Sequence, residues 1–305
     1  MVNSRGVARL GILAVGLGIG AAVASTPGVA RADDFQISID GMDLFSTVGN
    51  TATAYSGTGD IAIAYGDGAY AWAEGGTGDV AMASGSDADA VAGGLSGDTN
   101  ANDDTSIDIG TNTNYSDGAW AGNSDLVGAT DGGTGSGDTA IDIGNNSGTY
   151  GDGSFAGAGG LVEETGNGND DTAIDVGDNT QAIDGSFAYG GDDNHASAFG
   201  DNSDGAADTG NDNTAEVYGP NSDAGAYSGD SNTAYVFDPF GTDGSTAIAG
   251  DHGNSDLSAV FGDDLFSDYA TGHDDLYDIL TPAGDLPGTA AATSGGWLAE
   301  LLSLF

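Results

Sequence analysis

The chain has 305 residues, and its 48 aspartate and glutamate residues are opposed by only three arginines and no lysine, for a formal net charge of −45 at pH 7. Such a molecule repels nucleic acids and anionic lipid headgroups, so partners of both kinds are excluded. There is no cysteine to form a disulfide, and the 56 glycines disfavour long helices.

The first 32 residues predict a cleaved export signal. Arg5 and Arg9 precede an apolar run over residues 10–24, and residues 30–32 (Ala-Arg-Ala) match a small-x-small cleavage pattern. The run is shorter than the roughly 20 residues that a membrane helix needs. Cleavage after Ala32 would remove all three arginines, so we expect a secreted or envelope protein without Lys or Arg. The alternative is an uncleaved anchor.

Residues 33–48 predict a capping strand, because residues 35–40 alternate in polarity. The region 49–262 then repeats with a period of 19. Residues 58–66 recur as 77–85, and residues 213–218 recur as 232–237. A longer unit over residues 104–110 returns at 138–144 and 171–177.

Each repeat consists of a short alternating segment followed by a turn of Gly, Asp, Asn or Ser. This pattern predicts an all-β, irregular parallel β-solenoid with two strands in each coil of about 19 residues. Thr139, Ile141 and Ile143 are expected to face inward, whereas Glu216 would force Ala215 and Val217 inward. We therefore expect a one-residue register slip, with an insertion at 161–164. The alternative is a disordered acidic polymer.

The C-terminal region differs from the repeats. Residues 263–280 lose the glycine punctuation and have helix-compatible spacing, which predicts a C-terminal cap. Residues 281–305 predict a proline-containing linker and a short apolar tail, which we expect to pack on the protein itself.

Calcium is the best ligand hypothesis, because hard cations bind carboxylate and carbonyl oxygens in Gly-rich turns. The turns at 75–79, 132–138 and 165–170 resemble incomplete Gly-Gly-x-Gly-x-Asp sequences. The predicted ligands are Asp79, Asp138, Asn169 and Asp170. The alternative is that these residues only favour turns and solubility.

No catalytic residue and no other cofactor is predicted. The three histidines, His195, His252 and His273, lack the clustered ligands that zinc requires. A polysaccharide-active β-helix enzyme is the alternative class, but such sites usually use Arg or Lys to stabilise an oxyanion. Two sets of residues recur at strand positions. The aromatic set is Tyr70, Trp72, Trp120, Phe155, Phe187, Tyr189 and Phe199, and the threonine set is Thr105, Thr139, Thr172, Thr214, Thr233 and Thr246. The first predicts aromatic stacking along the rod, with a carbohydrate-contacting stripe as the alternative. The second resembles the threonine ladder of ice-binding solenoids, but the second threonine of each strand is missing.

The signal ending in Ala-Arg-Ala-Asp-Asp and the residues 35–45 that follow resemble secreted Gly/Ala/Asp-rich proteins of mycobacteria. The repeats are similar to the Gly-rich portion of the PE-PGRS group, although no PE domain is present. They also resemble the β-roll heads of trimeric autotransporter adhesins and calcium-binding RTX repeats. The resemblance implies an envelope or extracellular location and a structural or adhesive role.

Together, these features predict a non-enzymatic structural or interaction protein, stabilised by calcium or other divalent cations. Its expected partners are a second copy of itself or a component of the envelope or of a host surface.

Overall fold

The computed structural model describes residues 34–93, 101–113, 118–122, 135–147, 153–157, 168–181, 184–238, 244–250, 255–261, 266–270 and 276–280. Within these ranges the chain forms strands and no helix. The expected export signal, the 161–164 insertion, the 281–305 tail, His252 and His273 lie outside the described residues.

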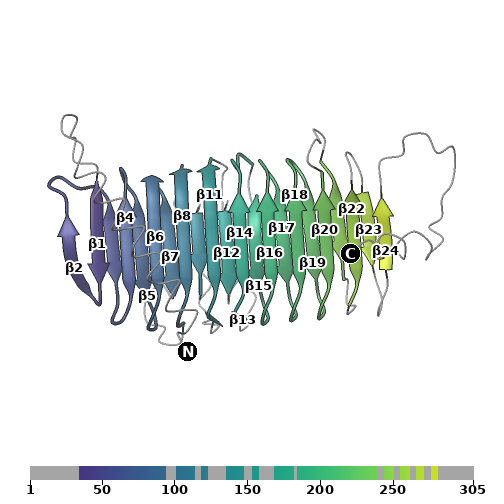
Figure 1. Cartoon of the computed structure of the whole chain (residues 1–305), viewed down its shortest axis with the longest axis horizontal. Coiled ribbons are helices and arrows are strands. Elements are labelled where there is room, and N and C mark those ends of the chain that lie inside the picture. The colour runs from purple at the N-terminus through teal and green to yellow at the C-terminus, as the bar shows by residue number, and fades with distance from the viewer. Residues whose placement is uncertain are drawn as a thin grey trace, which may run out of the picture.

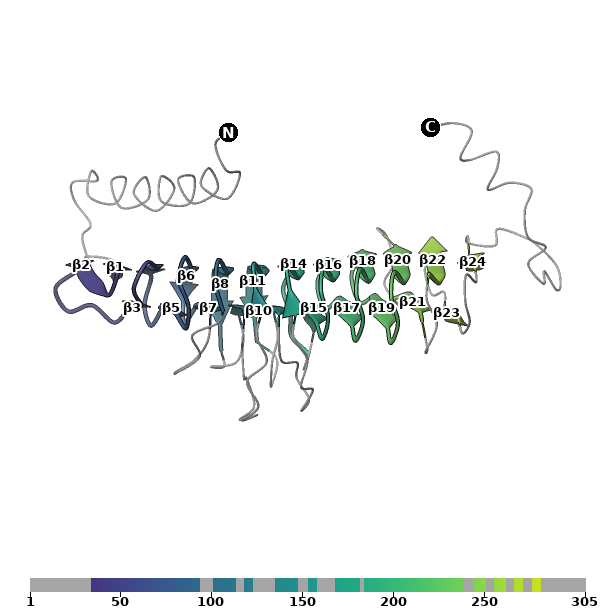
Figure 2. The same ribbon diagram turned by 90° about the horizontal axis from the view of Figure 1, so that it is seen from below.

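The strands form two long sheets that lie face to face along a rod (Figures 1 and 2). Sheet A has twelve strands in the order β2 (Met42–Ser46), β1 (Phe35–Ile39), β4 (Ile61–Tyr65), β6 (Val80–Ser86), β8 (Thr105–Asn112), β11 (Thr139–Asn146), β14 (Thr172–Val176), β16 (His195–Phe199), β18 (Thr214–Tyr218), β20 (Thr233–Phe237), β22 (Leu257–Phe261) and β24 (Leu276–Leu280). Sheet B has ten strands in the order β23 (Phe266–Ala270), β21 (Thr246–Ala249), β19 (Asp223–Tyr227), β17 (Asp204–Asp208), β15 (Gly185–Tyr189), β12 (Gly153–Gly157), β9 (Gly118–Ala121), β7 (Asp89–Gly93), β5 (Tyr70–Glu74) and β3 (Thr53–Ser56). A two-stranded sheet pairs β10 (Gly135–Ser136) with β13 (Gly168–Asn169).

From β3 onward the chain alternates between the two long sheets, and each of their strands pairs in parallel with the strand one coil later. His195 pairs with Thr214, and Thr214 pairs with Thr233, so two successive coils have the predicted length of 19 residues. Longer coils occur in the middle, where Thr105 pairs with Thr139 and Thr139 pairs with Thr172. The prediction of an all-β, irregular parallel solenoid is therefore confirmed, while the 19-residue length applies to only some of its coils.

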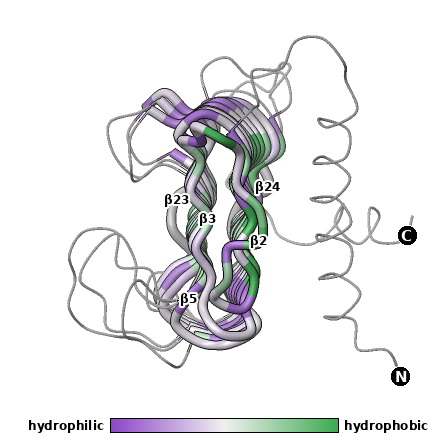
Figure 3. The backbone as a smooth tube through the Cα atoms, turned by 90° about the vertical axis from the view of Figure 1, so that its left-hand side faces the viewer, coloured by the Kyte–Doolittle hydropathy of each residue, from purple (hydrophilic) through white to green (hydrophobic). Residues whose placement is uncertain are grey.

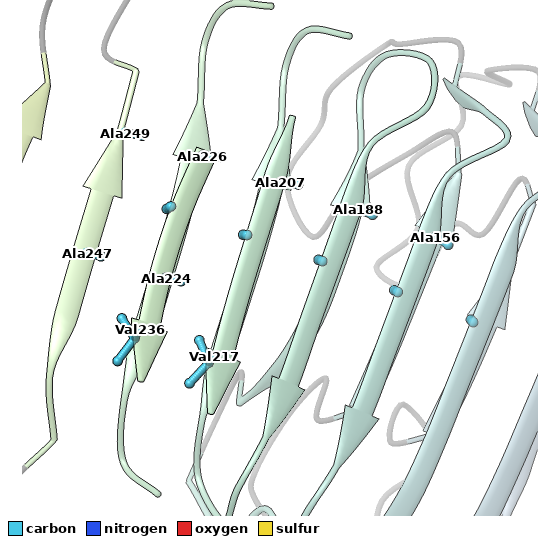
Figure 4. Close-up of a cluster of buried hydrophobic side chains, with 14 of the residues drawn as sticks. Ala156, Ala188, Ala207, Val217, Ala224, Ala226, Val236, Ala247 and Ala249 are labelled. Atoms are coloured by element: carbon cyan, nitrogen blue, oxygen red, sulfur yellow. The ribbon is translucent and has the colours of Figure 1, made fainter. Parts of the chain in front are cut away.

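The space between the sheets is narrow and filled mainly by alanine and valine. In sheet B, Ala188, Ala207 and Ala226 lie in register on adjacent strands and are fully buried, as Figure 4 shows. On sheet A, Val217 and Val236 occupy the equivalent inward row. Small side chains are needed here because two sheets enclosed by tight turns leave little room between them.

The predicted register slip is wrong. Thr139, Thr172, His195 and Thr214 lie in one continuous row, so β11, β14, β16 and β18 keep the same phase. Among the described strands of sheet A, register shifts occur only at its two ends, in the pairs β1–β2 and β22–β24. Asp142 is fully buried and Ile143 is 42% exposed, which is the reverse of the expected orientation. The hydrophobicity rule fails here because the interior at this coil accommodates a hydrogen-bonded carboxyl, while the isoleucines form rows on the outer face.

The ends of the sheets differ in their pairing. At the N-terminal end, β1 pairs antiparallel with both β2 and β4. At the C-terminal end, the helix-compatible interpretation of 263–280 is wrong, because β23 and β24 are strands that pair in parallel with β21 and β22. Pairing with an open sheet edge decides the conformation of these segments, whose local sequence is ambiguous. Within the described part of the chain, no helix is long and apolar enough to cross a membrane.

Candidate functional site

A column of Asp and Asn side chains follows one edge of sheet A, at the position immediately before each parallel strand up to β22. We call this column the inner ladder. Its members are Asp60, Asp79, Asp104, Asp138, Asp171, Asn194, Asn213, Asn232 and Asp256, all at most 1% exposed. The side-chain Oδ1 of each of the first eight members accepts a hydrogen bond of 2.7–3.1 Å from the backbone N–H of the next member. The ladder therefore joins each of these coils to its neighbour.

The residue before every ladder member has a positive φ, and this turn directs the ladder side chain into the protein. Gly occupies that position three times, at φ 84–91°, while Asp or Ser occupies it six times, at φ 57–65°. Glycine has no Cβ penalty in this conformation, and aspartate tolerates it better than most residues. The local sequence Gly/Asp/Ser followed by Asp/Asn thus builds the ladder.

The ladder aspartates carry a second carboxyl oxygen whose environment is poor in donors. The Oδ2 atoms of Asp104, Asp138 and Asp171 are buried and accept no hydrogen bond. Burial, with a contribution from neighbouring Asp138, raises the pKa of Asp104 to about 9. Burial raises the pKa of Asp138 to about 7, and burial with Asp138 raises the pKa of Asp171 to about 9. Near neutral pH, the raised pKa values mean that the folded protein retains protons on Asp104 and Asp171 and partly on Asp138.

A second column of carboxyls lies inside sheet A, in the three coils whose Thr-Ser/Ala-Ile-Asp repeats were recognised in the sequence. Asp108, Asp142 and Asp175 pair in register and are fully buried. Burial and the Asp142 carboxyl raise the pKa of both Asp108 and Asp175 well above the usual range.

Each of these three aspartates accepts a hydrogen bond from the asparagine four residues later. The Nδ2 of Asn112 donates to Asp108 at 2.7 Å, and the Nδ2 of Asn179 donates to Asp175 at 2.6 Å. Asn146 makes the same contact with Asp142. An amide donor stabilises one carboxyl oxygen but supplies no positive charge, so the column keeps its need for a proton or a cation.

Sheet B adds a third acidic group at the start of its later strands. Burial raises the pKa of Asp204 well above its usual range, with contributions from Asp223 and Asp184. Asp184 and Asp223 also have raised pKa values, caused mainly by burial. The acidic groups therefore approach one another on both sheets.

This arrangement can hold protons or hard cations. The only Lys or Arg residues of the whole chain are Arg5, Arg9 and Arg31, so no such side chain from the described residues neutralises the columns. Carboxyl and amide oxygens are the donors that calcium prefers. However, no group of three or more His, Cys, Asp or Glu residues in the described ranges is arranged to hold a metal ion.

The predicted calcium ligands do not meet at one site. Asp79 and Asp138 are both members of the inner ladder, with Asp104 between them. Asp170 is an exposed turn residue at φ 57°, one coil beyond Asp138. Asn169 lies in β13, and its Nδ2 donates to Asp192 Oδ1 at 2.6 Å.

Sequence reasoning missed the role of Asp104, Asp171 and the Asp108 column. A usable signal was present, because an Asp or Asn comes directly before the first residue of every parallel strand of sheet A from β4 to β22. The Ile-Asp-Ile or Ile-Asp-Val segments also repeat in register. Assigning the buried face by hydrophobicity alone concealed this second signal.

The expected aromatic stacking is confirmed for part of the set. On sheet B, Phe155 stacks on Phe187 at 5.4 Å between ring centroids and on Trp120 at 6.5 Å. These rings lie on the opposite side of the strands from the interior alanines, and they are at most 4% exposed. Phe199 instead stacks on Tyr218 in sheet A, at 5.1 Å.

No family model, curated protein or solved structure matches this chain.

Proposed function

We propose that this protein is a secreted, non-enzymatic structural or interaction protein of the extracellular space or cell envelope, and that protons or calcium stabilise its interior carboxyls. The observation that carries the proposal is the inner ladder. Its Asp and Asn side chains join successive coils by hydrogen bonds, so part of the acidity of the chain stabilises the rod itself. The predicted export signal and the absence of Lys and Arg beyond residue 31 support the location.

Calcium stabilisation is tested by thermal unfolding of the purified chain at pH 7, followed by circular dichroism in EDTA and during calcium titration. We expect a β-rich spectrum and an unfolding temperature that rises with millimolar calcium. Sodium chloride at matched ionic strength is the control for screening of surface charge. A rise no larger than in the control would contradict a calcium role, and a random-coil spectrum under all conditions would contradict the structural rod.

The location and the lack of enzymatic activity need separate measurements. Expression with the native N-terminus is expected to give protein in the medium that begins at Asp33 by mass spectrometry. Retention of residues 1–32 would contradict cleavage. Degradation of any member of a panel of neutral and acidic glycans by the purified protein would contradict the non-enzymatic assignment.

A further inference from the structure

The outward face of sheet A is apolar over nearly its whole length. We define the sheet A face as the three outward rows of strands β1, β4, β6, β8, β11, β14, β16, β18, β20 and β22. Aliphatic or aromatic side chains occupy four of ten positions in the first row, eight in the second and nine in the third. Most of the remaining positions in the first row are threonine. In Figure 3, green marks hydrophobic residues along the sheet that contains β2 and β24.

The sheet A face is almost free of charge in a chain with 48 acidic residues. Glu216 is its one carboxylate among thirty outward positions on the ten strands. The corresponding positions of sheet B carry five, namely Glu74, Asp89, Asp204, Asp208 and Asp223, of which Asp89 is only 3% exposed and Asp204 has a buried carboxyl oxygen. The sheet A face therefore carries fewer carboxylates than the outward side of sheet B.

Several of its largest side chains are open to solvent. Ile109 is 40% exposed, and Ile143 and Phe237 are each 42% exposed. At the N-terminal end of the face, Ile37, Ile63, Val80 and Met82 are at most 8% exposed, so the open part runs from β8 to β22. With strands about 4.8 Å apart and about 3.4 Å per residue, these seven five-residue strands cover about 570 Å². Exposed apolar patches above a few hundred Å² mark interaction sites on soluble proteins.

We propose that the sheet A face binds the same face of a second copy of this chain, in a two-fold symmetric, face-to-face dimer. The open parts of two such faces bury about 1,100 Å² in total, which exceeds the roughly 1,000 Å² that a specific interface needs. A basic partner would find only Glu216 to pair with on this face, and the net charge of the chain repels an anionic lipid surface. Sheets pack face to face about 10 Å apart, so the rows of one copy can interdigitate with those of the other.

This inference goes beyond the proposed structural role, because it names the partner and the surface. It also fixes the sign of the salt dependence. Pairing brings the acidic turns at the rims of two rods together, while the faces themselves contribute few charges. Added salt screens that repulsion and should strengthen the dimer, whereas an interface held by ion pairs would weaken.

The test is sedimentation velocity of the secreted protein over a range of concentrations, at about 0.05 and 0.5 M sodium chloride. We expect a monomer–dimer equilibrium that shifts toward dimer at high salt. A monomer at every concentration and salt level overturns the proposal. If that monomer binds neutral phosphatidylcholine vesicles, a lipid surface covers the face in place of a second copy.

Variants locate the interface. Ile143→Glu places a carboxylate on the exposed face, and the two-fold symmetry places it there twice. We therefore expect the dissociation constant of the dimer to rise by about 100-fold. Ile248→Glu, at an outward position of sheet B, is the matched control and should leave the equilibrium unchanged. Glu216→Gln should tighten the dimer, since it removes the one carboxylate that pairing buries. Equal effects of Ile143→Glu and Ile248→Glu would refute the assignment to sheet A. Circular dichroism verifies that each variant is folded.

Discussion

Replacing Asp104 with asparagine removes one buried carboxyl from the inner ladder while retaining the acceptor oxygen. Asp104 has a pKa of about 9 in the folded protein, against the ordinary value of 3.8 for an aspartate in the unfolded chain. Because the folded pKa is raised, the stability that this group contributes is present below pH 3.8 and is lost as the pH rises toward 9. Between pH 3.8 and pH 7 the loss is about 4 kcal/mol, at about 1.4 kcal/mol per pH unit.

The asparagine variant does not lose stability as the pH rises, because its side chain does not titrate. Its Nδ2 group, however, needs a hydrogen-bond acceptor. Elsewhere in the same ladder, the Nδ2 of Asn232 donates to the Tyr227 carbonyl at 3.2 Å, so the position accommodates an amide. An unmade amide hydrogen bond would cost about 1–3 kcal/mol. We therefore expect Asp104→Asn to raise the free energy of unfolding at pH 7 by about 1–4 kcal/mol, and to give no gain at pH 4.

The assay is urea unfolding followed by tryptophan fluorescence at pH 4, 5.5, 7 and 8.5 in EDTA. The buried Trp120 provides a probe in a coil next to Asp104. Asp87→Asn is the matched control, because it makes the same carboxyl-to-amide change in an exposed turn at φ 53°, where asparagine is tolerated. A lower midpoint for Asp104→Asn at pH 7, or a wild-type midpoint that does not change between pH 4 and pH 7, would refute the reasoning.

Three further outcomes are expected. The thermal midpoint of the wild-type protein in EDTA should fall as the pH rises from 4 to 9, since the pKa of Asp138 is raised to about 7 and that of Asp171 to about 9; calorimetry showing a rise would contradict this. Ala207→Leu should lower the free energy of unfolding by about 1–3 kcal/mol or more, because its fully buried position between the sheets has no space for the added carbons, as urea unfolding would reveal. Gly144→Ala should cost more than about 3 kcal/mol in the same assay, because its Cβ would lie 1.6 Å from the Gly177 carbonyl oxygen; Gly49→Ala, with open space around its Cβ, should cost only about 1 kcal/mol, and equal losses would show that the coil spacing is not the cause.

Much of the fold could be predicted from repetition alone. The 19-residue period and the Gly/Asp/Asn turns are properties of the chain that any reader can count, and they indicate a coil of two short strands. The turn chemistry is local, since a positive φ is easiest for Gly and tolerable for Asp and Asn. The role of the inner ladder was also within reach of the sequence, because Asp or Asn precedes strand after strand in the same place.

Which face of each strand is buried was decided only by the tertiary structure. Judged by hydrophobicity, Ile141 and Ile143 belong inside and Asp142 outside, yet the parallel register with the Ala-rich coils fixes the opposite orientation. Asn146 then supplies the hydrogen bond that makes the buried carboxyl tolerable. A strand pattern of period two has two equivalent solutions, and the neighbouring coil chooses between them.

Composition follows from the sequence, whereas the position of each side chain, inside or outside, follows from the stacking of coils. The sequence by itself determined that the protein is acidic, repetitive and without Lys or Arg beyond residue 31. Stacking of the coils determined where that acidity lies, with carboxyls in the interior and along the turns. It also placed rows of apolar side chains on the outward side of sheet A. The physical reason is that each coil is too small to bury anything alone, so its inside and outside are defined only by its neighbours.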